Sequence, residues 1–340
     1  MKKKIYIAYT GGTIGMQKTG QGHYVPVPNS LNSLMAENLA FQHDELPEYV
    51  IHEYDPLLDS PNMTPGDWSR IAEDICQNYG DYDGFVVLHG TDTMTYTASA
   101  LAFMLDGLAK PVIVTGSQIP LCEIRNDAQE NLITSMILAA NYDIPEVCLY
   151  FNGRLFRGCR TVKIDAIGFD AFESSNYPPL ATVGIDFKLN HKRIKPMPKT
   201  STGVHLERIN DPSNVATFRI FPGMTPDILK NILQAPLRGL ILETYGAGNA
   251  PTNDPRFLAL LQKAIANDIV VVNITQCLRG VVDSGKYATG AALANIGVIS
   301  GYDMTTEAAL TKLAYLFSRD WDTTTIKRLM QQNLRGELTE

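Results

Sequence analysis

The stretch from Ile5 to Gly15, IYIAYTGGTIG, most constrains what this chain can fold into. Residues 5–9 are apolar or aromatic without a break, which favours a buried central strand. Gly11 and Gly12 then allow a sharp turn at little steric cost, and Thr13 follows directly. Because open α/β sheets bind ligands at the carboxyl ends of their strands, the pattern predicts that Thr13 lies at a ligand-binding crevice.

Three interpretations of this turn stay open on local grounds. It could be a purely structural turn from strand to helix, because Gly-Gly turns are common. A dinucleotide fingerprint would need glycines at positions 10, 12 and 15 and an acidic residue after a second strand, but position 10 is Thr10 and residues 29–34 read NSLNSL. The third interpretation is a nucleophilic hydroxyl on Thr13, which requires helper groups elsewhere in the chain.

The composition is that of a globular protein with a sizeable core. The chain has 340 residues, of which 45% are hydrophobic, and this length is compatible with two domains. Its 29 basic and 36 acidic residues give a net charge of -7, which argues against nucleic acid or an anionic membrane as the main partner. The one basic run, residues 188–199, contains two prolines and is typical of a solvated linker.

The cysteines, the histidines and the N-terminal residues point to a cytoplasmic protein without a metal site. The five cysteines are scattered without a Cys-x-x-Cys pair, which is typical of reduced, mostly buried thiols. The six histidines show no metal-ligand spacing. After the basic start MKKK the apolar run is shorter than the core of about 7 to 15 residues in a signal peptide. No apolar segment approaches the length of about 18 residues that would suggest a membrane span.

A second buried strand also ends in a glycine and polar residues. Residues 84–88 lead to Gly90 and then to Thr91 and Asp92, before apolar residues at helical spacing begin at Met94. Thr91 and Asp92 could cap that helix, although one cap residue is enough. A third strand, 111–115, is followed by a glycine, Ser117 and Gln118. Since parallel strands end at one edge of a sheet, the three turns should line a single polar crevice.

Two loops in the first third of the chain hold further candidates. Residues 16–28 contain two glycines and two prolines and predict a mobile loop, in which Tyr24 is either a lid residue or a packing aromatic. Asp59 and Ser60 follow a strand expected near 49–54. Because Thr64 is the better cap for the next helix, these two residues are free for another task.

Lys163 lies in a cation-rich segment, residues 152–165, that predicts a loop. Its neighbours Val162 and Ile164 are β-branched. An ordinary lysine would be solvated and without function, whereas a lysine with a partly buried ammonium has a lowered pKa and can accept a proton. Both interpretations stay open from the local sequence.

The order of strands and helices predicts an α/β fold in two domains. We expect a larger N-terminal doubly wound domain with a mostly parallel sheet over residues 1–189, a linker over 190–213 and a smaller C-terminal α/β domain over 214–340. In the C-terminal domain, strands are expected near 216–221, 238–243 and 269–274. Helices are expected near 225–234, 254–266, 288–296, 304–317 and 322–333.

Residues 9–15, YTGGTIG, and 84–94, GFVVLHGTDTM, resemble the two signature segments of the bacterial asparaginase and glutaminase family. Their order and separation match, and the similarity extends along essentially the whole chain. Without a signal peptide, the chain looks like the cytoplasmic type I members. The resemblance implies a two-domain α/β fold, hydrolysis of L-asparagine to L-aspartate and ammonia, no cofactor, and a homotetramer built as a dimer of dimers.

The resemblance also implies roles for the residues named above. Thr13 would be the nucleophile that forms an aspartyl ester, and Tyr24 the lid residue that contacts it. Thr91, Lys163 and Asp92 would form a proton relay. The residues expected to bind the substrate are Asp59, Ser60, Gly90, Thr91, Asp92, Ser117 and, from the neighbouring protomer, Asn249.

Some cytoplasmic members hold a second asparagine in an effector pocket between protomers, clamped by an arginine where this chain has Glu243. A carboxylate there reverses the sign of the interaction with the effector's own carboxylate. Thr275 and Cys277 match other positions of that pocket. We therefore expect no activation by asparagine.

Two alternatives to a free-standing amidohydrolase are less consistent with the sequence. An asparaginase-like component of a tRNA-dependent amidotransferase carries an added N-terminal domain, whereas here the first motif begins at residue 5. A catalytically dead regulator that binds an amino acid would lack the nucleophile or the lysine, and Thr13 and Lys163 are both present.

Overall fold

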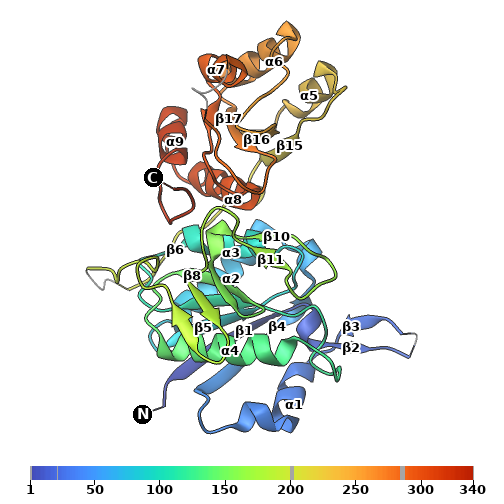
Figure 1. The fold of residues 1–340 in the computed structure, drawn as a ribbon, viewed down its shortest axis with the longest axis vertical. Helices are drawn as coiled ribbons and strands as arrows, with labels where there is room; N and C mark the ends of the chain where they lie inside the picture. The colour runs from blue at the N-terminus through green and yellow to red at the C-terminus, as the bar shows by residue number, and fades with distance from the viewer. Residues whose placement is uncertain (1, 21, 200–202, 284–287, 340) are drawn as a thin grey trace. The chain divides into compact units, whose positions relative to one another are not determined.

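The computed structural model describes residues 2–20, 22–199, 203–283 and 288–339, which form two compact units. Unit 1 spans Met1–Glu207 and unit 2 spans Arg208–Glu340 (Figure 1). The boundary between the units lies within 190–213, the range expected for a linker. Residues 190–207 of that range belong to unit 1. None of the helices in these described ranges is long and apolar enough to cross a membrane.

Unit 1 is built on a mostly parallel eight-stranded sheet with the order β13-β12-β9-β8-β7-β5-β1-β4. The five strands from β8 to β4 run parallel, and β9, β12 and β13 add antiparallel pairs at the other edge. The strands are β1 (Lys4–Gly11), β4 (Glu48–Leu58), β5 (Gly84–Leu88), β7 (Val112–Thr115), β8 (Val147–Phe151), β9 (Arg154–Arg157), β12 (Ala181–Val183) and β13 (Phe187–Leu189).

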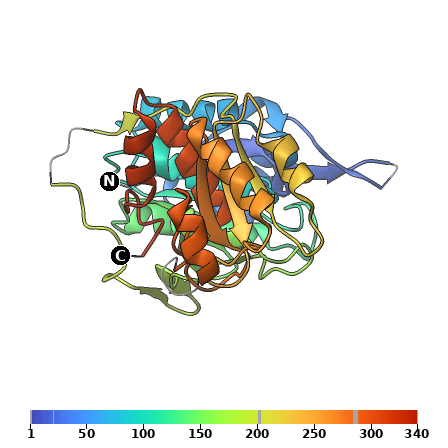
Figure 2. The same ribbon diagram turned by 90° about the horizontal axis from the view of Figure 1, so that it is seen from above.

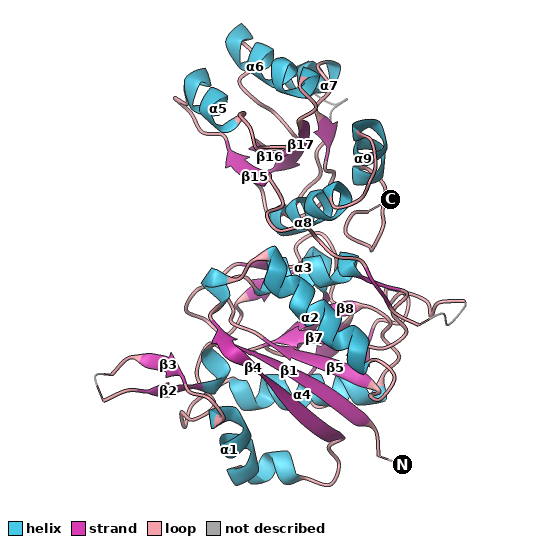
Figure 3. Cartoon of the chain, turned by 180° about the vertical axis from the view of Figure 1, so that it is seen from behind, coloured by secondary structure: helices cyan, strands magenta, loops and turns pink. Residues whose placement is uncertain are grey.

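Helices cover both faces of this sheet, α2 and α3 on one face and α4 on the other (Figure 3). Alternate residues of β1, namely Ile5, Ile7 and Tyr9, pack with Leu132 and Met136 of α4 in the main core. The helices are α1 (Ser30–Glu37), α2 (Pro65–Asn78), α3 (Met94–Met104) and α4 (Ala128–Asn141), with short 3-10 turns η1 (Thr13–Gly15), η2 (Leu39–Gln42), η3 (Ser60–Asn62) and η4 (Gly158–Arg160).

The prediction of loops over residues 16–28 and 152–165 was wrong in part. Residues 16–28 contain an antiparallel hairpin of β2 (Met16–Lys18) and β3 (Tyr24–Pro26), which extends away from the sheet (Figures 1 and 2). Residues 152–165 contain β9, η4 and β10 (Val162–Lys163), which pairs with β11 (Phe172–Glu173). A further short pair joins β6 (Leu105–Asp106) to β14 (His205–Leu206). Strands this short contain too few residues for an alternating pattern to be recognised.

Unit 2 is a smaller parallel sheet with the order β15-β16-β17-β18. Residues of α5, α6 and α7 form a core against one face, whereas Leu313 and Phe317 of α8 pack against Gly239. The elements are β15 (Val215–Arg219), α5 (Pro226–Ile232), β16 (Gly239–Thr244), α6 (Pro255–Ala266), β17 (Val270–Thr275), α7 (Ala288–Asn295), β18 (Ile299–Ser300), α8 (Thr306–Phe317) and α9 (Thr323–Met330).

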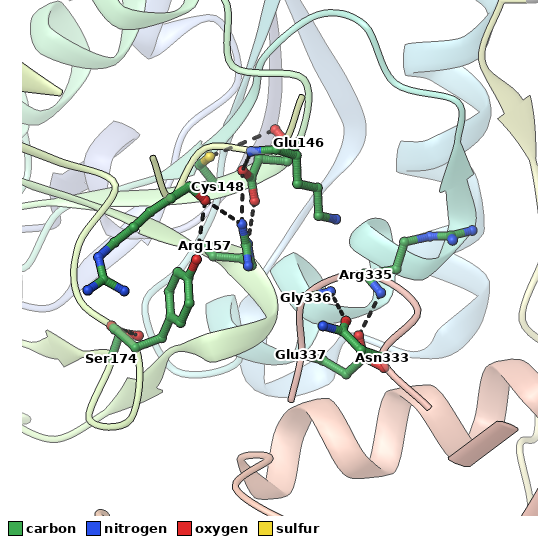
Figure 4. Close-up of polar contacts among 11 residues, drawn as sticks. Glu146, Cys148, Arg157, Ser174, Asn333, Arg335, Gly336 and Glu337 are labelled. Atoms are coloured by element: carbon green, nitrogen blue, oxygen red, sulfur yellow. Dashed lines mark hydrogen bonds and ion pairs between the residues drawn. The ribbon is translucent and has the colours of Figure 1, made fainter. Parts of the chain in front are cut away.

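Each unit encloses a buried ion pair. In unit 1 the Arg157 Nε lies 2.5 Å from the Glu146 carboxylate, with the two side chains 7% and 1% exposed (Figure 4). In unit 2 the Lys312 Nζ lies 2.5 Å from Glu337, and both side chains are fully buried. The Glu337 carboxylate also accepts hydrogen bonds from the backbone N–H groups of Leu334 at 3.0 Å and Arg335 at 2.6 Å (Figure 4). Burial is the largest single effect on Glu337 and disfavours its charged form. The charge of Lys312 and the hydrogen bonds from Lys312 and from the backbone of Leu334 and Arg335 together outweigh burial, so the pKa of Glu337 is lowered.

The thiols are less buried than expected. Cys148 and Cys159 are buried, Cys76 is half-buried, and Cys122 and Cys277 are exposed. The prediction of mostly buried thiols was therefore wrong, because side-chain exposure in loops depends on packing that spacing alone does not encode.

Candidate active site

The turns after β1, β5 and β7 lie in direct contact because glycines leave room for their backbones. A methyl group on Gly12 would lie 2.4 Å from the backbone nitrogen of Gly90. One on Gly116 would lie 2.2 Å from the carbonyl oxygen of His89. Contacts this short exclude any side chain at these positions. The structure therefore brings the polar residues that follow the three strands to one edge of the sheet, as the sequence predicted.

Thr13 starts the 3-10 turn η1 immediately after two glycines with positive φ, 131° at Gly11 and 82° at Gly12. L-residues rarely adopt these backbone angles, so glycine is required there. The turn is fastened by Thr10, whose hydroxyl donates to the carbonyl oxygen of Leu88 at 2.8 Å. Thr13 itself is half-buried, so part of the residue is accessible to solvent.

Lys163 joins the site from β10 and contacts two residues of the second turn. Its Nζ lies 2.9 Å from the hydroxyl of Thr91 and 2.7 Å from the carboxylate of Asp92. The Lys163 side chain is 18% exposed, whereas the Asp92 side chain is 61% exposed. The Lys163 side chain is thus largely shielded from water, and its ammonium lies between a hydroxyl and a carboxylate, an arrangement suited to moving a proton.

Gln118 completes this group from the third turn. The sequence placed it beside Ser117 in that turn but gave it no role in binding or catalysis. The Thr91 hydroxyl donates to Gln118 Oε1 at 3.1 Å, and Gln118 Nε2 donates to the carbonyl oxygen of Gly168 at 3.1 Å. The carboxylate of Asp127, also missed, accepts from the backbone N–H groups of Gln118 at 2.9 Å and Ile119 at 3.0 Å. Asp127 immediately precedes α4 but makes no side-chain cap hydrogen bond to it. The sequence alone does not show whether such an aspartate caps the helix or binds the preceding turn.

Ser60 and Ser117 are buried hydroxyls beside the same turns, with 2% and 1% exposure. A methyl group on Gly90 would lie 2.5 Å from Ser60 Oγ, which places Ser60 against the second turn. Asp59, the residue before it, is exposed. The Ser117 Oγ has no hydrogen-bond partner within the described part of the chain. Burial of an unpaired hydroxyl is costly, so Ser117 is suited to bind a polar group of a ligand.

Tyr24 lies on the hairpin and contacts a residue that was not predicted to belong to the site. Its hydroxyl donates to Glu123 Oε1 at 2.7 Å, and its side chain is 40% exposed. This hydrogen bond raises the pKa of the Tyr24 hydroxyl. The contact with Thr13 that the resemblance implies remains a prediction.

His89 is fully buried beneath the second turn. Its Nδ1 lies 2.6 Å from the carbonyl oxygen of Gly90, and its Nε2 lies 2.8 Å from the hydroxyl of Thr97. A carbonyl only accepts, so Nδ1 carries the proton and Nε2 accepts from Thr97. Burial lowers the pKa of His89 to about 4, so the ring is neutral at pH 7. No group of three or more His, Cys, Asp or Glu that could hold a metal ion exists among the residues described.

The remaining predicted residues lie in unit 2. Asn249, in the turn after β16, is half-buried, and its amide oxygen accepts from the Thr289 hydroxyl at 2.6 Å. Glu243 and Thr275 lie at the carboxyl ends of the neighbouring strands β16 and β17, and the Thr275 hydroxyl accepts from the backbone N–H of Cys277 at 3.0 Å.

Glu243 is shielded from water, with its side chain 15% exposed. Burial raises the pKa of Glu243, partly offset by the charge of Arg219, whose Nη1 lies 4.0 Å away, and by a hydrogen bond with Thr306.

Known proteins match this chain along its length. A family model described as "Asparaginase, N-terminal" matches residues 4–195, and one described as "Glutaminase/Asparaginase C-terminal domain" matches residues 214–330. L-asparaginase 1 of Escherichia coli K12 is 55% identical over 338 residues, covering 99% of this chain and 98% of that protein. The crystal structure of L-asparaginase I from Vibrio cholerae is 50% identical, with a TM-score of 0.92 and full coverage of both chains.

A more distant relative is the L-asparaginase of Thermococcus kodakarensis, which is 35% identical over 341 residues and covers 99% of both chains. Both domains of the family are thus present in order, together with the glycine-lined turns and the lysine that contacts them. The chain belongs to the asparaginase and glutaminase family.

Proposed function

We propose that this chain hydrolyses the side-chain amide of L-asparagine to L-aspartate and ammonia, with Thr13 as the nucleophile. The observation that carries the proposal is the contact of Lys163 with Thr91 and Asp92 beside the turn that presents Thr13. The identity to proteins named L-asparaginase supports the same substrate.

In the proposed mechanism, the Thr13 oxygen attacks the amide carbonyl and ammonia leaves, so that an ester joins Thr13 to the aspartyl group. A water molecule then attacks the ester and releases aspartate and the free hydroxyl. The Thr91 oxygen lies within hydrogen-bond reach of Lys163. An unprotonated Lys163 would draw a proton from Thr91 or from a water in contact with it, and Asp92 would hold the lysine in place.

The charged and polar groups of the substrate require partners, which the residues of the three turns and of the segment before α2 offer. The Asp92 and Asp59 carboxylates are suited to bind the α-ammonium, Ser60 the α-carboxylate and Ser117 the side-chain amide. We further propose that Asn249 completes the site of a neighbouring copy in a homotetramer, a dimer of dimers, and that the enzyme is cytoplasmic and needs no cofactor.

Ammonia release from asparagine by purified Thr13→Ala tests the nucleophile. We expect turnover to fall to a few per cent or less while the free energy of unfolding stays near that of the parent, because Thr13 is half-buried at a turn. Thr13→Ser, which keeps the hydroxyl, is the matched control and should retain part of the activity. Substantial turnover in the alanine variant would assign the nucleophile elsewhere. The assay of the parent protein also separates this proposal from the two alternatives. A catalytically dead binding protein would release no ammonia, and a component of an amidotransferase would release little ammonia without its partner.

A further inference from the structure

The hairpin of β2 and β3 grows directly out of the turn that carries Thr13. η1 ends at Gly15 and β2 begins at Met16, so any movement of the hairpin starts beside the proposed nucleophile. Among the described strands the hairpin pairs only with itself, with Lys18 opposite Tyr24. An isolated two-stranded hairpin is marginally stable in water, so its position depends on the contacts that it makes with the rest of unit 1.

One loop, residues 119–127, supplies hydrogen bonds that hold the hairpin and its root. The N–H of Leu121 donates to the carbonyl oxygen of Ile14 at 3.0 Å, and the Cys122 thiol donates to that of Met16 at 3.5 Å. Both hold the root of the hairpin. Glu123 holds a point further out, where its carboxylate accepts from the Tyr24 hydroxyl at 2.7 Å.

Glu123 is itself well fixed. The side chain of Asn126 donates to the Glu123 carbonyl oxygen at 2.6 Å. The carboxylate of Asp127 accepts from the backbone of Gln118 and Ile119, so the loop is anchored at the third turn of the crevice. The loop of residues 119–127 therefore holds the hairpin and also binds the backbone of Gln118, whose side chain contacts Thr91.

A phenol has one proton to donate, and here the Tyr24 hydroxyl donates it to Glu123. While this bond exists, Tyr24 cannot donate to a group in the proposed active site. Lys18 lies over the Tyr24 ring, with its Nζ 5.8 Å from the ring centre, and so moves with the tyrosine rather than with Glu123. Hydrogen bonds to an ionised carboxylate are stronger than those between neutral groups, so the carboxylate is an effective competitor for this proton.

We propose that Glu123 is a positioning residue that docks the hairpin in a resting state through Tyr24, and that this hydrogen bond, the latch, must break before the hairpin closes over a substrate. The kinetic effect of the latch rests on the proposed function, whereas the position of the hairpin can be measured in the free protein. Because only the unlatched molecules can close, removing the latch raises the fraction of competent molecules.

Hydrogen exchange and steady-state kinetics on Glu123→Ala test this role. We expect faster amide exchange in peptides that contain residues 16–18 and 24–26 of the free protein. We also expect a KM for asparagine lowered at least about threefold, with little change in kcat. Glu123→Gln keeps an acceptor for the Tyr24 hydroxyl and should lie closer to the parent. Ile124→Ala changes the adjacent, fully exposed side chain and should behave like the parent in both measurements.

A double-mutant cycle with Tyr24→Phe separates the latch from other effects of Glu123. In the phenylalanine background the latch is already absent, so Glu123→Ala should add nothing to hairpin exchange or to KM. Equal effects in both backgrounds, or faster exchange without a lower KM, would overturn the proposal. If the parent releases no ammonia from asparagine, the proposed function fails by itself, and the exchange comparison still decides whether Glu123 holds the hairpin.

Discussion

Gly12 and Gly90 are in backbone contact, so close that a methyl group on Gly12 would lie 2.4 Å from the Gly90 nitrogen. This contact sets the spacing between the turn that presents Thr13 and the turn that presents Thr91. Backbone atoms cannot move aside as a flexible side chain can, so the spacing tolerates no added atom at position 12.

Gly12→Ala should therefore lower both stability and turnover. The φ of 82° at Gly12 is unfavourable for alanine. The strain of such a conformation costs roughly 1 to 3 kcal/mol before the contact with Gly90 is counted. Gly20→Ala is the control, because a methyl group there would meet nothing within 4 Å. Urea unfolding and ammonia release measure both effects, and equal behaviour of the two variants would contradict the role of the contact.

Lys163→Met should reduce kcat by about two to four orders of magnitude, the usual scale for loss of a general base. Methionine keeps most of the stem, so the fold should survive. Lys163→Arg keeps the positive charge opposite Asp92 but cannot release a proton, so we expect it to be nearly as inactive. Recovery of activity in the arginine variant would show that only the charge at position 163 is needed.

Because of His89, the free energy of unfolding should decrease as the pH is lowered. Its pKa is lowered from 6.5 to about 4 in the folded state, so the neutral ring stabilises the fold fully above about pH 6.5. That contribution, roughly 3 kcal/mol, is lost as the pH falls from 6.5 towards 4. In this pH range the imidazole of the unfolded chain binds a proton, whereas the buried imidazole of the folded chain stays neutral. His89→Gln should lack this part of the pH dependence in urea unfolding, whereas His191→Gln, at an exposed position, should keep it. A parallel pH profile for His89→Gln and the parent would refute the assignment.

Activation by asparagine should be absent, because Glu243 presents a carboxylate where an effector's carboxylate would bind. Its pKa is raised by burial, yet Arg219 favours the charged form. A like charge there would cost more than the coupling of about 1 to 3 kcal/mol typical of allostery. The initial rate against asparagine concentration should follow a hyperbola, with a Hill coefficient near one. A sigmoidal curve that becomes hyperbolic in Glu243→Ala would show that Glu243 itself serves an effector site.

The glycine-rich turns could be predicted from sequence because their signal is local. Gly11 and Gly12 before Thr13 predict backbone angles that only glycine adopts easily. In the structure both glycines have positive φ. The parallel core was predictable for the same reason, since long apolar strands alternate with helices. Both inferences needed only neighbouring residues.

The partners of the site residues could not be predicted in this way. Tyr24 and Glu123 are 99 positions apart, and Lys163 and Thr91 are 72 apart, so their contacts depend on how the sheet and its loops pack. Asp127 has the appearance of a helix cap in sequence, and only the structure shows that its carboxylate binds the turn at Gln118. The hairpin strands were missed because each has three residues.

The buried pair of Lys312 and Glu337 has a consequence for how the chain is made. Lys312 lies on α8, and its counter-charge follows 25 positions later, after α9. A growing chain emerges from the ribosome from its N-terminus, so α8 appears before the carboxylate that neutralises its lysine. Burying that ammonium alone would be strongly unfavourable. We therefore expect unit 2 to complete its fold only after Glu337 has left the ribosome, whereas unit 1, which ends at Glu207, does not depend on this pair.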